Sequence, residues 1–316
     1  MNLRDYQIKA VEDLRREFSE GKKRLILQMP TGSGKTVVAC EVIKRAIERG
    51  TKVIFLVNRR ELAFQASEKL DAYGVPYPSQ HAIIMGNMEY FPAAPVQVCS
   101  IQTLYSRRKQ LAELHPGIII YDECHESVAP SRRKVLAQFE DAYWIGLSAT
   151  PTRHPSRGNL GLIWEDIVRG PKYEMLIKEG HLVKTRVFIP TIPDLTGAKV
   201  GGDGDYLQNA ELRKRMESKA IYGDVFEEYE KHATGRSTIV FCVDRAHSRG
   251  VCDAFVQRGY SARHIDGNTD KKERDEAIAD FKSGKVKVIT NCKVLGEGLD
   301  VPIASCVINL KPTKSL

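Results

Sequence analysis

Short, continuous apolar runs recur along the chain and alternate with segments whose apolar residues follow a helical spacing. Continuous apolar runs are typical of strands buried on both faces of a parallel sheet, and the helical segments supply the crossovers that parallel strands need. The pattern therefore predicts an α/β fold with parallel sheets flanked by helices. Strands are predicted at 24–28, 53–57, 81–85, 97–100, 117–121, 144–148, 187–189, 238–242, 262–265, 286–291 and 306–310, and helices at 37–47 and within 206–232.

The predicted strands form two series, separated by an irregular stretch at 152–180 that contains prolines and glycines. At about 100 to 200 residues per domain, a chain of 316 residues has room for two domains, each with its own core. We therefore expect one lobe at 1–170, a linker at 171–185 and a second lobe at 186–316.

A glycine-rich turn, Met-Pro-Thr-Gly-Ser-Gly-Lys-Thr, follows the first predicted strand and precedes a helical run. Glycines let the backbone curl so that successive N–H groups face an anion, and the helix adds the positive end of its dipole. Lys35 is then placed to reach the β and γ phosphates of a nucleotide, and the Thr36 hydroxyl to hold Mg²⁺. Met29 stands where the usual pattern has glycine, and an ordinary turn is the alternative, although such turns rarely end in Gly-Lys-Thr. The predicted nucleotide contacts are Thr31, Gly32, Ser33, Gly34, Lys35 and Thr36.

A second signal follows the apolar run at 117–121, where Asp122 and Glu123 are adjacent and His125 comes shortly after. Two carboxylates at the end of a buried strand are costly to bury without a partner, and Mg²⁺ held by the phosphate loop is such a partner. Asp122 is predicted to orient the metal and Glu123 to polarise an attacking water, with His125 and Lys35 completing the catalytic set. Asp-Glu-x-His alone also occurs on solvated loops, so its place after the phosphate loop is what makes it informative.

These motifs resemble those of superfamily two helicases and translocases, in the DEAD/DEAH-box group with a DECH variant. The resemblance implies two RecA-like lobes, ATP and Mg²⁺ as cofactors, and a nucleic-acid partner. It also implies that Arg4 and Gln7, in the segment Leu-Arg-Asp-Tyr-Gln, contact adenine, because a Gln amide can pair with both N6 and N7 of that base.

Further segments are similar to other motifs of the family: 57–65 to motif Ia, 100–104 to Ib, 147–151 to III, 239–247 to IV and 288–302 to V. In motif Ia, Asn58 replaces the usual proline. Each segment alone would pass as an ordinary strand end, and their order carries the resemblance. By this resemblance the nucleic-acid contacts are Arg59, Arg60, Gln102, Thr103 and Thr290, the coupling residues are Ser148 and Thr150, and two further nucleotide contacts are Gly298 and Asp300.

The resemblance stops at the last residues of the sequence. After the strand predicted at 306–310 the family continues into motif VI, a helix that supplies an arginine finger to the γ phosphate, whereas this sequence ends with Lys-Pro-Thr-Lys-Ser-Leu. Because such a finger contributes roughly 10³ to 10⁵ in rate, we expect ATP turnover to be affected more than binding. A C-terminally incomplete second lobe would expose a sheet edge and an apolar face, which predicts a protein partner or self-association.

Two functions from different classes are open at this stage. The first is an ATP-dependent helicase or translocase, in which ATP closes the lobes and the nucleic-acid contacts shift along a strand. The second is a nucleotide-gated nucleic-acid-binding module without turnover. The ordered motifs of the second half argue against a small-molecule kinase, and no nuclease segment of a restriction motor is visible. DNA is favoured over RNA because the DECH variant and the N-terminal segment resemble the DNA-repair and phage-type branch.

Composition adds few constraints. The net charge of +8 and the sequence pI of about 9.0 suit a polyanionic partner, although modest basicity is common in other proteins. Seven cysteines without paired spacing favour a reducing compartment, and core positions are favoured over a metal site for Cys242, His247 and Cys252. The N-terminus is charged and no apolar run approaches the ~18 residues of a membrane span, so we expect no membrane contact and a cytoplasmic location, in a host cell if the gene is viral.

Overall fold

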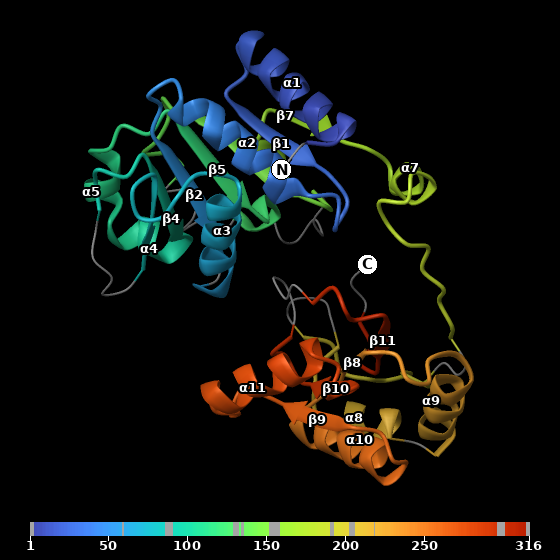
Figure 1. The fold of residues 1–316 in the computed structure, drawn as a ribbon. Coiled ribbons are helices and arrows are strands. Elements are labelled where there is room, and N and C mark those ends of the chain that lie inside the picture. Colours follow the sequence, from blue (N-terminus) through green and yellow to red (C-terminus); the bar gives the residue numbers. More distant parts are fainter. Residues whose placement is uncertain are drawn as a thin grey trace. The chain divides into compact units, whose positions relative to one another are not determined.

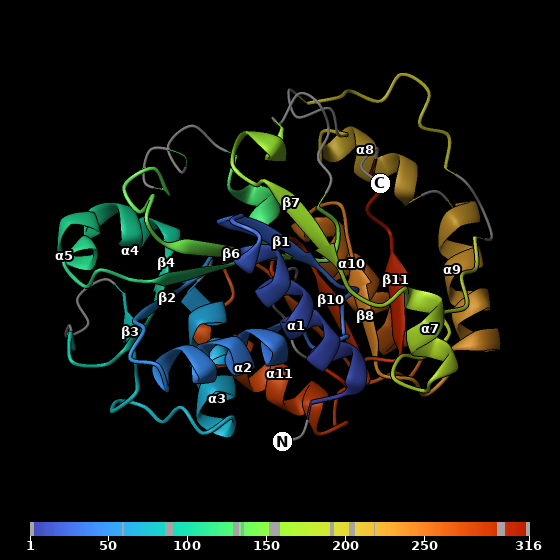
Figure 2. The same cartoon turned by 90° about the horizontal axis from the view of Figure 1, so that it is seen from above.

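Two parallel β-sheets, one in each half of the chain, organise the computed structural model of the protein (Figure 1, Figure 2). It describes residues 3–313 except 59, 86–90, 129–132, 134–135, 152–158, 190–192, 202–205, 218 and 296–300, and it leaves the side chains at 60, 61 and 219–224 undescribed. The chain divides into two units, residues 1–185 and 186–316. Helices flank both parallel sheets, so the predicted α/β fold class is confirmed.

The first unit carries seven parallel strands in the order β3-β4-β2-β5-β6-β1-β7. These are β1 (Arg24–Gln28), β2 (Val53–Val57), β3 (His81–Ile84), β4 (Val96–Ser100), β5 (Ile118–Asp122), β6 (Tyr143–Ser148) and β7 (Asp166–Arg169). The described helices are α1 (Asp5–Ser19), α2 (Lys35–Ile47), α3 (Arg60–Ala72), α4 (Ile101–Ser106), α5 (Arg108–Ala112), η1 (Cys124–Glu126), η3 (Leu160–Leu162) and α7 (Tyr173–Lys178). Because the strands are parallel, their carboxyl ends lie along one edge.

Alternate residues of the central strands enter two different cores. Leu25 of β1 belongs to the core that includes α1, α2 and α3, whereas its neighbour Ile26 belongs to the core that includes α4 and α5. Burial on both faces is the reason that β1 has a continuous apolar sequence. Trp144 and Trp164, the two tryptophans of the chain, lie in the second of these cores, where Trp164 Nε1 donates to Ser127 Oγ at 3.0 Å.

The second unit carries four parallel strands in the order β11-β8-β10-β9. These are β8 (Thr238–Phe241), β9 (Ala262–Ile265), β10 (Val288–Asn291) and β11 (Cys306–Asn309), and the described helices are α8 (Ala210–Met216), α9 (Lys219–His232), α10 (Arg245–Gln257) and α11 (Lys271–Lys282). One core packs β8 and β10 against α8, α9 and α10, and the other packs them against α11. Helices α8 and α9 confirm the helical prediction for 206–232.

The seven cysteines are unpaired, and six of them are buried. Cys306 on β11 is half-buried. In the part of the chain that the structure describes, no helix is both long enough and apolar enough to cross a membrane.

The strand predicted at 187–189 is not a strand in the structure, so this prediction was wrong. Val187 and Ile189 are 76% and 73% exposed, and Phe188 stacks on His232 with ring centroids 4.0 Å apart. Residues with a β preference form a strand where a neighbouring strand supplies hydrogen bonds and a packing surface. The residue types at 187–189 have a β preference, but no strand among the described residues pairs with this segment.

Strand β7 was not predicted, because 166–169 was expected to belong to an irregular stretch. Asp166 and Arg169 leave two apolar residues between them, too short a run to be recognised as a strand. β7 is nevertheless held at the edge of the sheet by parallel pairing with β1, and Lys22 Nζ lies 2.5 Å from Asp166 Oδ2 and 2.5 Å from Glu17 Oε2. These partners are distant in sequence, so no local pattern reports them.

Lowering the pH from 7 to 4 is expected to destabilise the second unit through His247 on α10. The ring is fully buried and its Nδ1 accepts the Val243 N–H at 3.3 Å; burial lowers the pKa of His247 to about 4, an effect that Asp244 opposes and Arg213 reinforces. The folded pKa lies below the unfolded value of about 6.5, so the contribution to stability is complete above about pH 6.5 and is lost as the pH falls to about 4, by roughly 3 kcal/mol. Hydrogen exchange of peptides from β8 to β10 measures it.

His247→Gln is the matched variant, because the glutamine oxygen can still accept the Val243 N–H but does not titrate. Its hydrogen-exchange protection should change little over the same pH range. An equally steep loss of protection in this variant would show that another group is responsible.

Candidate nucleotide site and nucleic-acid contacts

Three loops of the first unit leave neighbouring strands at the same edge of the sheet. Strands β5, β6 and β1 are adjacent. The Asp-Glu pair begins at the last residue of β5, the Ser-Ala-Thr motif begins at the last residue of β6, and the glycine-rich loop follows β1. In open parallel sheets, ligands bind outside the carboxyl ends of the strands. The sheet order therefore brings together segments that are far apart in the sequence.

Met29 explains why the loop departs from the usual glycine pattern. Its side chain is fully buried in the core and its N–H donates to Ser148 O at 3.1 Å, so this position needs no glycine. Glycines stand where the backbone is left-handed, with φ of 80° at Gly32 and 85° at Gly34. A Cβ at Gly34 would also lie 2.5 Å from Gln7 Nε2. The loop thus has glycine at the two positions that require it.

Lys35 begins α2, and its ammonium turns back over the loop. Its Nζ donates to Met29 O at 3.3 Å. Burial lowers the pKa of Lys35, and the charges of Glu123 and Asp122 oppose that shift. A partly desolvated ammonium beside a helix N-terminus is well suited to bind phosphate oxygens. The other predicted contacts of the loop are Thr31 and Gly32, which are exposed, Gly34 and Thr36, which are half-buried, and Ser33, which is buried.

Asp122, the last residue of β5, has the environment of a metal ligand. Burial raises the pKa of its carboxyl to about 6, the charge of Glu123 raises it as well, and Lys35 acts in the opposite direction. A desolvated carboxylate is favourable beside a cation, because the cation compensates the charge that burial penalises. Mg²⁺ prefers oxygen ligands and keeps several waters. Asp122 and the Thr36 hydroxyl offer oxygen atoms of the kind that Mg²⁺ prefers.

Glu123 is held in an uncommon backbone conformation. Its φ of 52° lies in the left-handed region, and its N–H donates to Asp122 Oδ1 at 3.1 Å. Glu123 Oε2 lies 3.2 Å from His125 Nδ1, and this contact lowers the pKa of Glu123 although the side chain is partly buried. Strain of this kind is found at functional sites, where the surrounding structure maintains it. The result is an ionised carboxylate in a fixed position, as a general base requires.

His125 connects Glu123 to strand β6. Its Nδ1 lies 3.5 Å from Ser148 Oγ, and Ser148 is fully buried at the end of β6. The side chain of Thr150 is exposed. Of the two residues predicted to couple hydrolysis to movement, Ser148 therefore contacts the catalytic segment directly, and Thr150 is presented to solvent.

The N-terminal segment is bonded to the phosphate loop. Gln7 Nε2 and the Tyr6 hydroxyl donate to Ser33 O at 3.1 and 3.0 Å, and Gln7 Oε1 accepts the Arg4 N–H at 2.9 Å. A glutamine amide has two N–H groups and two acceptor lone pairs, so one of each remains for an adenine edge. The role of Tyr6 was missed, because its neighbour Gln7 was the residue that the motif resemblance singled out.

The nucleic-acid contacts predicted in the first unit lie in different environments. Gln102 is exposed on α4, whereas Thr103 is buried, with its N–H donating to Ser100 Oγ at 3.2 Å and its hydroxyl 3.0 Å from the same oxygen. Thr103 thus helps to cap α4, and Gln102 is the side chain that a ligand can reach. Arg59 and the side chain of Arg60 lie outside the described residues.

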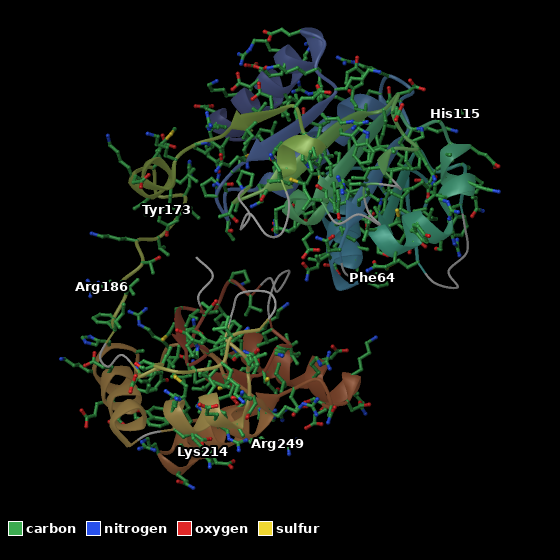
Figure 3. The ribbon with its side chains drawn as sticks, turned by 180° about the vertical axis from the view of Figure 1, so that it is seen from behind. Phe64, His115, Tyr173, Arg186, Lys214 and Arg249 are labelled. Carbon is green, nitrogen blue, oxygen red and sulfur yellow. The ribbon has the colours of Figure 1, made fainter. Side chains whose placement is uncertain are left out.

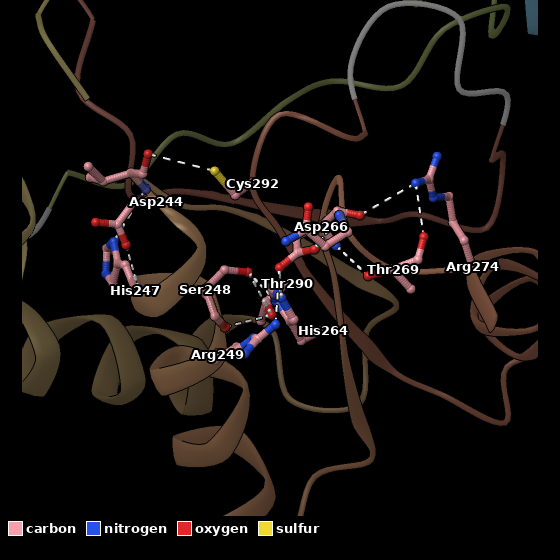
Figure 4. A network of polar contacts seen from close by, with 12 residues as sticks. Asp244, His247, Ser248, Arg249, His264, Asp266, Thr269, Arg274, Thr290 and Cys292 are labelled. Atoms are coloured by element: carbon pink, nitrogen blue, oxygen red, sulfur yellow. Dashed lines mark hydrogen bonds and ion pairs between the residues drawn. The ribbon is translucent and has the colours of Figure 1, made fainter. Parts of the chain in front are cut away.

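Thr290 of β10 is fully buried, and its hydroxyl is bonded to α10 (Figure 4). Thr290 Oγ1 donates to Ser248 O at 2.8 Å and accepts from Ser248 Oγ at 3.1 Å. Ser248 Oγ lies 2.8 Å from His264 Nδ1, and His264 Nε2 lies 3.0 Å from Asp266 Oδ2. These contacts join β9, β10 and α10. Two nucleotide contacts predicted for this unit, Gly298 and Asp300, lie outside the described residues.

Two family models match the chain, one in each unit. Residues 1–153 match the family described as "Type III restriction enzyme, res subunit", and residues 220–316 match "Helicase conserved C-terminal domain". The chain belongs to superfamily two of the helicases, among its DEAD/DEAH-like members. The resemblance found in the sequence motifs is therefore confirmed.

The chain has relatives in phages, fungi and archaea. It is 32% identical over 292 residues to the "51.5 kDa protein" of a Lactococcus phage, which covers 92% of the chain and 60% of that protein. It is 33% identical over 320 residues to "Putative mitochondrial ATP-dependent helicase irc3" of Schizosaccharomyces pombe, covering 97% and 52%. It is 24% identical over 353 residues to "DNA 3'-5' translocase XPB2" of Sulfurisphaera tokodaii, covering 98% and 74%. The chain thus spans between half and two thirds of the first two relatives.

The fold of the chain is shared with a solved structure, the Hef helicase domain of Pyrococcus furiosus. The two superpose with a TM-score of 0.60 at 18% identity, over 98% of this chain and 90% of that one. At this identity the likeness concerns the fold, and it supports the description of both units as RecA-like.

Proposed function

We propose that the protein is an ATP-dependent helicase or translocase acting on nucleic acid, with DNA preferred over RNA. The observation that carries this proposal is the convergence of Lys35, Asp122 and Glu123 at neighbouring strand ends of one sheet. They supply a partly desolvated ammonium, a half-buried carboxylate and an ionised carboxylate. These are the groups that phosphoryl transfer from ATP to water uses for phosphate binding, metal binding and orientation of the nucleophile.

Each residue has a separate task in this proposal. Lys35 and the backbone of the glycine-rich loop bind the phosphates, and Glu123, held by His125, accepts the proton of the attacking water. Thr36 and Asp122 would hold Mg²⁺, which supplies charge neutralisation on the phosphates when bound. Arg4 and Gln7 recognise the base.

Ser148 supports coupling between hydrolysis and movement of the nucleic acid. Ser148 Oγ lies 3.5 Å from His125 Nδ1, and the same nitrogen lies 3.2 Å from Oε2 of Glu123, the proposed general base. A change in the Glu123 environment during turnover is thereby transmitted to the segment that ends in the exposed Thr150. In the first unit we assign a nucleic-acid contact to Gln102, whose side chain is exposed.

The preference for DNA rests on two supports. The relative XPB2 is named a DNA 3'-5' translocase, and the net charge of +8 favours association with a polyanion. The 2′-hydroxyl is the group that distinguishes RNA from DNA. Single-stranded DNA, duplex DNA and RNA are therefore separate arms of the test.

ATP hydrolysis by the purified chain is expected to rise on addition of DNA and to be lost in Lys35→Ala. Removing a charge-stabilising donor from such a site lowers the rate by about 10² to 10³. Lys44→Ala, an exposed lysine in the last turn of the same helix, should keep the parent rate.

Three results would contradict the proposal. Stimulation by RNA without stimulation by DNA would reverse the substrate. Binding of ATP and DNA without turnover would favour the nucleotide-gated binding module. Equal loss in Lys35→Ala and Lys44→Ala would point to a damaged helix.

A further inference from the structure

The chain that leaves the sheet of the first unit after β7 returns to the glycine-rich loop. It runs from Gly170, directly after β7, through α7 to Thr185, the last residue of the first unit. A Cβ at Gly170 would lie 2.5 Å from Cγ of Met29, with which the glycine-rich loop begins. Further along this stretch, Leu182 approaches the middle of the same loop. The stretch therefore meets the loop at two places.

Leu182 lies against the loop at Gly32. A Cβ on Gly32 would lie 2.9 Å from Cδ2 of Leu182, so the leucine methyl group occupies the space that a side chain would need. Leu182 is half-buried and packs on the core that includes α1, α2 and α3. Because close-packed groups leave no free space, the loop cannot move toward this side unless Leu182 moves too.

The neighbouring residue, His181, is connected to the loop through Tyr6. The ring centroids of His181 and Tyr6 lie 5.5 Å apart, and the Tyr6 hydroxyl donates to Ser33 O at 3.0 Å. Two consecutive residues thus reach the loop, one directly at Gly32 and one through Tyr6 at Ser33. We call His181 and Leu182 the clasp.

Helix α7 holds the clasp in place. The N–H groups of His181 and Leu182 both donate to Leu176 O, at 2.8 and 3.0 Å, and the Leu176 side chain is fully buried in the same core. After the clasp, Val183 O accepts from the hydroxyl of Tyr173, the first residue of α7, at 3.3 Å (Figure 3). The position of the clasp is therefore fixed by contacts within the first unit.

The chain after the clasp is exposed. Residues 183–189 are all exposed, and the second unit begins within them at Arg186 (Figure 3). A displacement of the loop at Gly32 requires a displacement of Leu182, and this moves the start of the exposed chain. Coupling between two sites is reciprocal, so the state of the exposed chain also acts on the loop.

We propose that the clasp positions the glycine-rich loop for nucleotide binding, and that a bound nucleotide in turn steadies the exposed chain that follows the clasp. This inference rests on the proposed function, because it takes ATP as the ligand of the loop. His181 and Leu182 act through Tyr6 and Gly32, so they are positioning residues. Neither belongs to a motif on which the sequence resemblance was based.

Leu182→Ala removes the contact with Gly32. It is expected to weaken the binding of a fluorescent ATP analogue by about fivefold or more, the lower end of typical coupling between sites. The matched control is Val183→Ala, because the Val183 side chain is 84% exposed, and it should keep the parent affinity. Leu182→Met retains a side chain of similar volume and should recover most of the affinity.

The same comparison at His181 uses a ring and its removal. His181→Ala deletes the group beside Tyr6 and should weaken analogue binding, whereas His181→Phe retains an aromatic ring there and should bind more tightly than His181→Ala. Melting temperatures measured without nucleotide show whether each variant is folded.

Trypsin cleavage after Lys184 and Arg186 gives the reciprocal measurement, because both residues are exposed. Where opening is fast relative to cleavage, the cleavage rate follows the population of the open chain. A saturating ATP analogue should slow cleavage of the parent by about fivefold and should leave the rate for Leu182→Ala nearly unchanged. A leucine that only stabilised the fold would not make cleavage depend on the nucleotide.

Parent-like affinity in folded Leu182→Ala, or protection from trypsin that persists in it at saturation, would overturn this inference and leave the proposed function intact. Equal weakening by Val183→Ala would also overturn it. If Leu182→Ala does not fold, parent-like affinity and protection in His181→Ala overturn the inference instead. A parent chain that binds no ATP analogue would overturn both proposals. Normal binding and protection without ATP turnover would support the clasp and contradict the proposed function alone.

Discussion

Glu123→Gln is expected to lower ATP turnover by about 10² to 10⁴ while ATP binding is retained. The amide has nearly the shape of the carboxylate and can remain beside His125, but it cannot take a proton from water. The phosphate loop and Lys35 are untouched, so the nucleotide keeps its binding contacts. Steady-state hydrolysis and equilibrium binding of a fluorescent ATP analogue, measured on the same preparation, separate the two effects.

Glu126→Gln is the matched control, since Glu126 is a partly buried carboxylate in the same short helix, η1. Its turnover should stay within about twofold of the parent value, because it has no place in the proposed chemistry. Parallel loss of binding and turnover in Glu123→Gln would mean that Glu123 holds the loop in place. Unchanged turnover would exclude Glu123 as the general base.

Gly146→Ala is expected to destabilise the first unit by about 1 to 3 kcal/mol through overpacking. A Cβ at Gly146 on β6 would lie 2.6 Å from Cys124 Sγ, 2.8 Å from Cys124 Cβ and 2.7 Å from Trp164 Cη2. All of these atoms are buried, so the collision cannot be relieved by turning a side chain into solvent. Cys124 directly follows Glu123, and we therefore expect turnover to fall as well. Differential scanning calorimetry measures the stability, and ATP hydrolysis the functional cost.

Gly267→Ala is the control for this substitution, because a Cβ at Gly267 meets nothing within 4 Å. Its stability should change by less than about 0.5 kcal/mol. Adding Cys124→Ala to Gly146→Ala removes the sulfur from the collision and should restore part of the stability. A Gly146→Ala protein as stable as the parent would show that β6 and η1 are loosely packed.

Much of the fold could be predicted because its strands are buried on both faces. Burial of β1, β2 and β5 leaves continuous apolar runs, which are visible without knowledge of their neighbours. The glycine-rich loop and the Asp122–Glu123 pair were recognisable for a related reason. A left-handed backbone, and metal binding as proposed, restrict the residue types at a few consecutive positions, so the sequence of those positions alone is informative.

The remaining features depend on partners that are distant in the sequence. Whether 187–189 forms a strand depends on a pairing partner, and β7 exists because β1 accepts it. Met29 could replace glycine because the core on one side of the sheet has room for its side chain. The residue type at Thr290 does not show whether its hydroxyl faces a phosphate or Ser248. In each case the structure depends on a contact with another helix or strand, and the local sequence pattern does not indicate that contact.

The unequal distribution of tryptophan and accessible thiol makes this protein suited to energy-transfer measurements. Both tryptophans lie in one core of the first unit. Of the seven cysteines, Cys306 of the second unit is half-buried and the other six are buried. An acceptor dye attached at Cys306 would be excited from the Trp144 and Trp164 side. Its emission would report whether the distance between the two units changes when ATP is added, without any engineered labelling site.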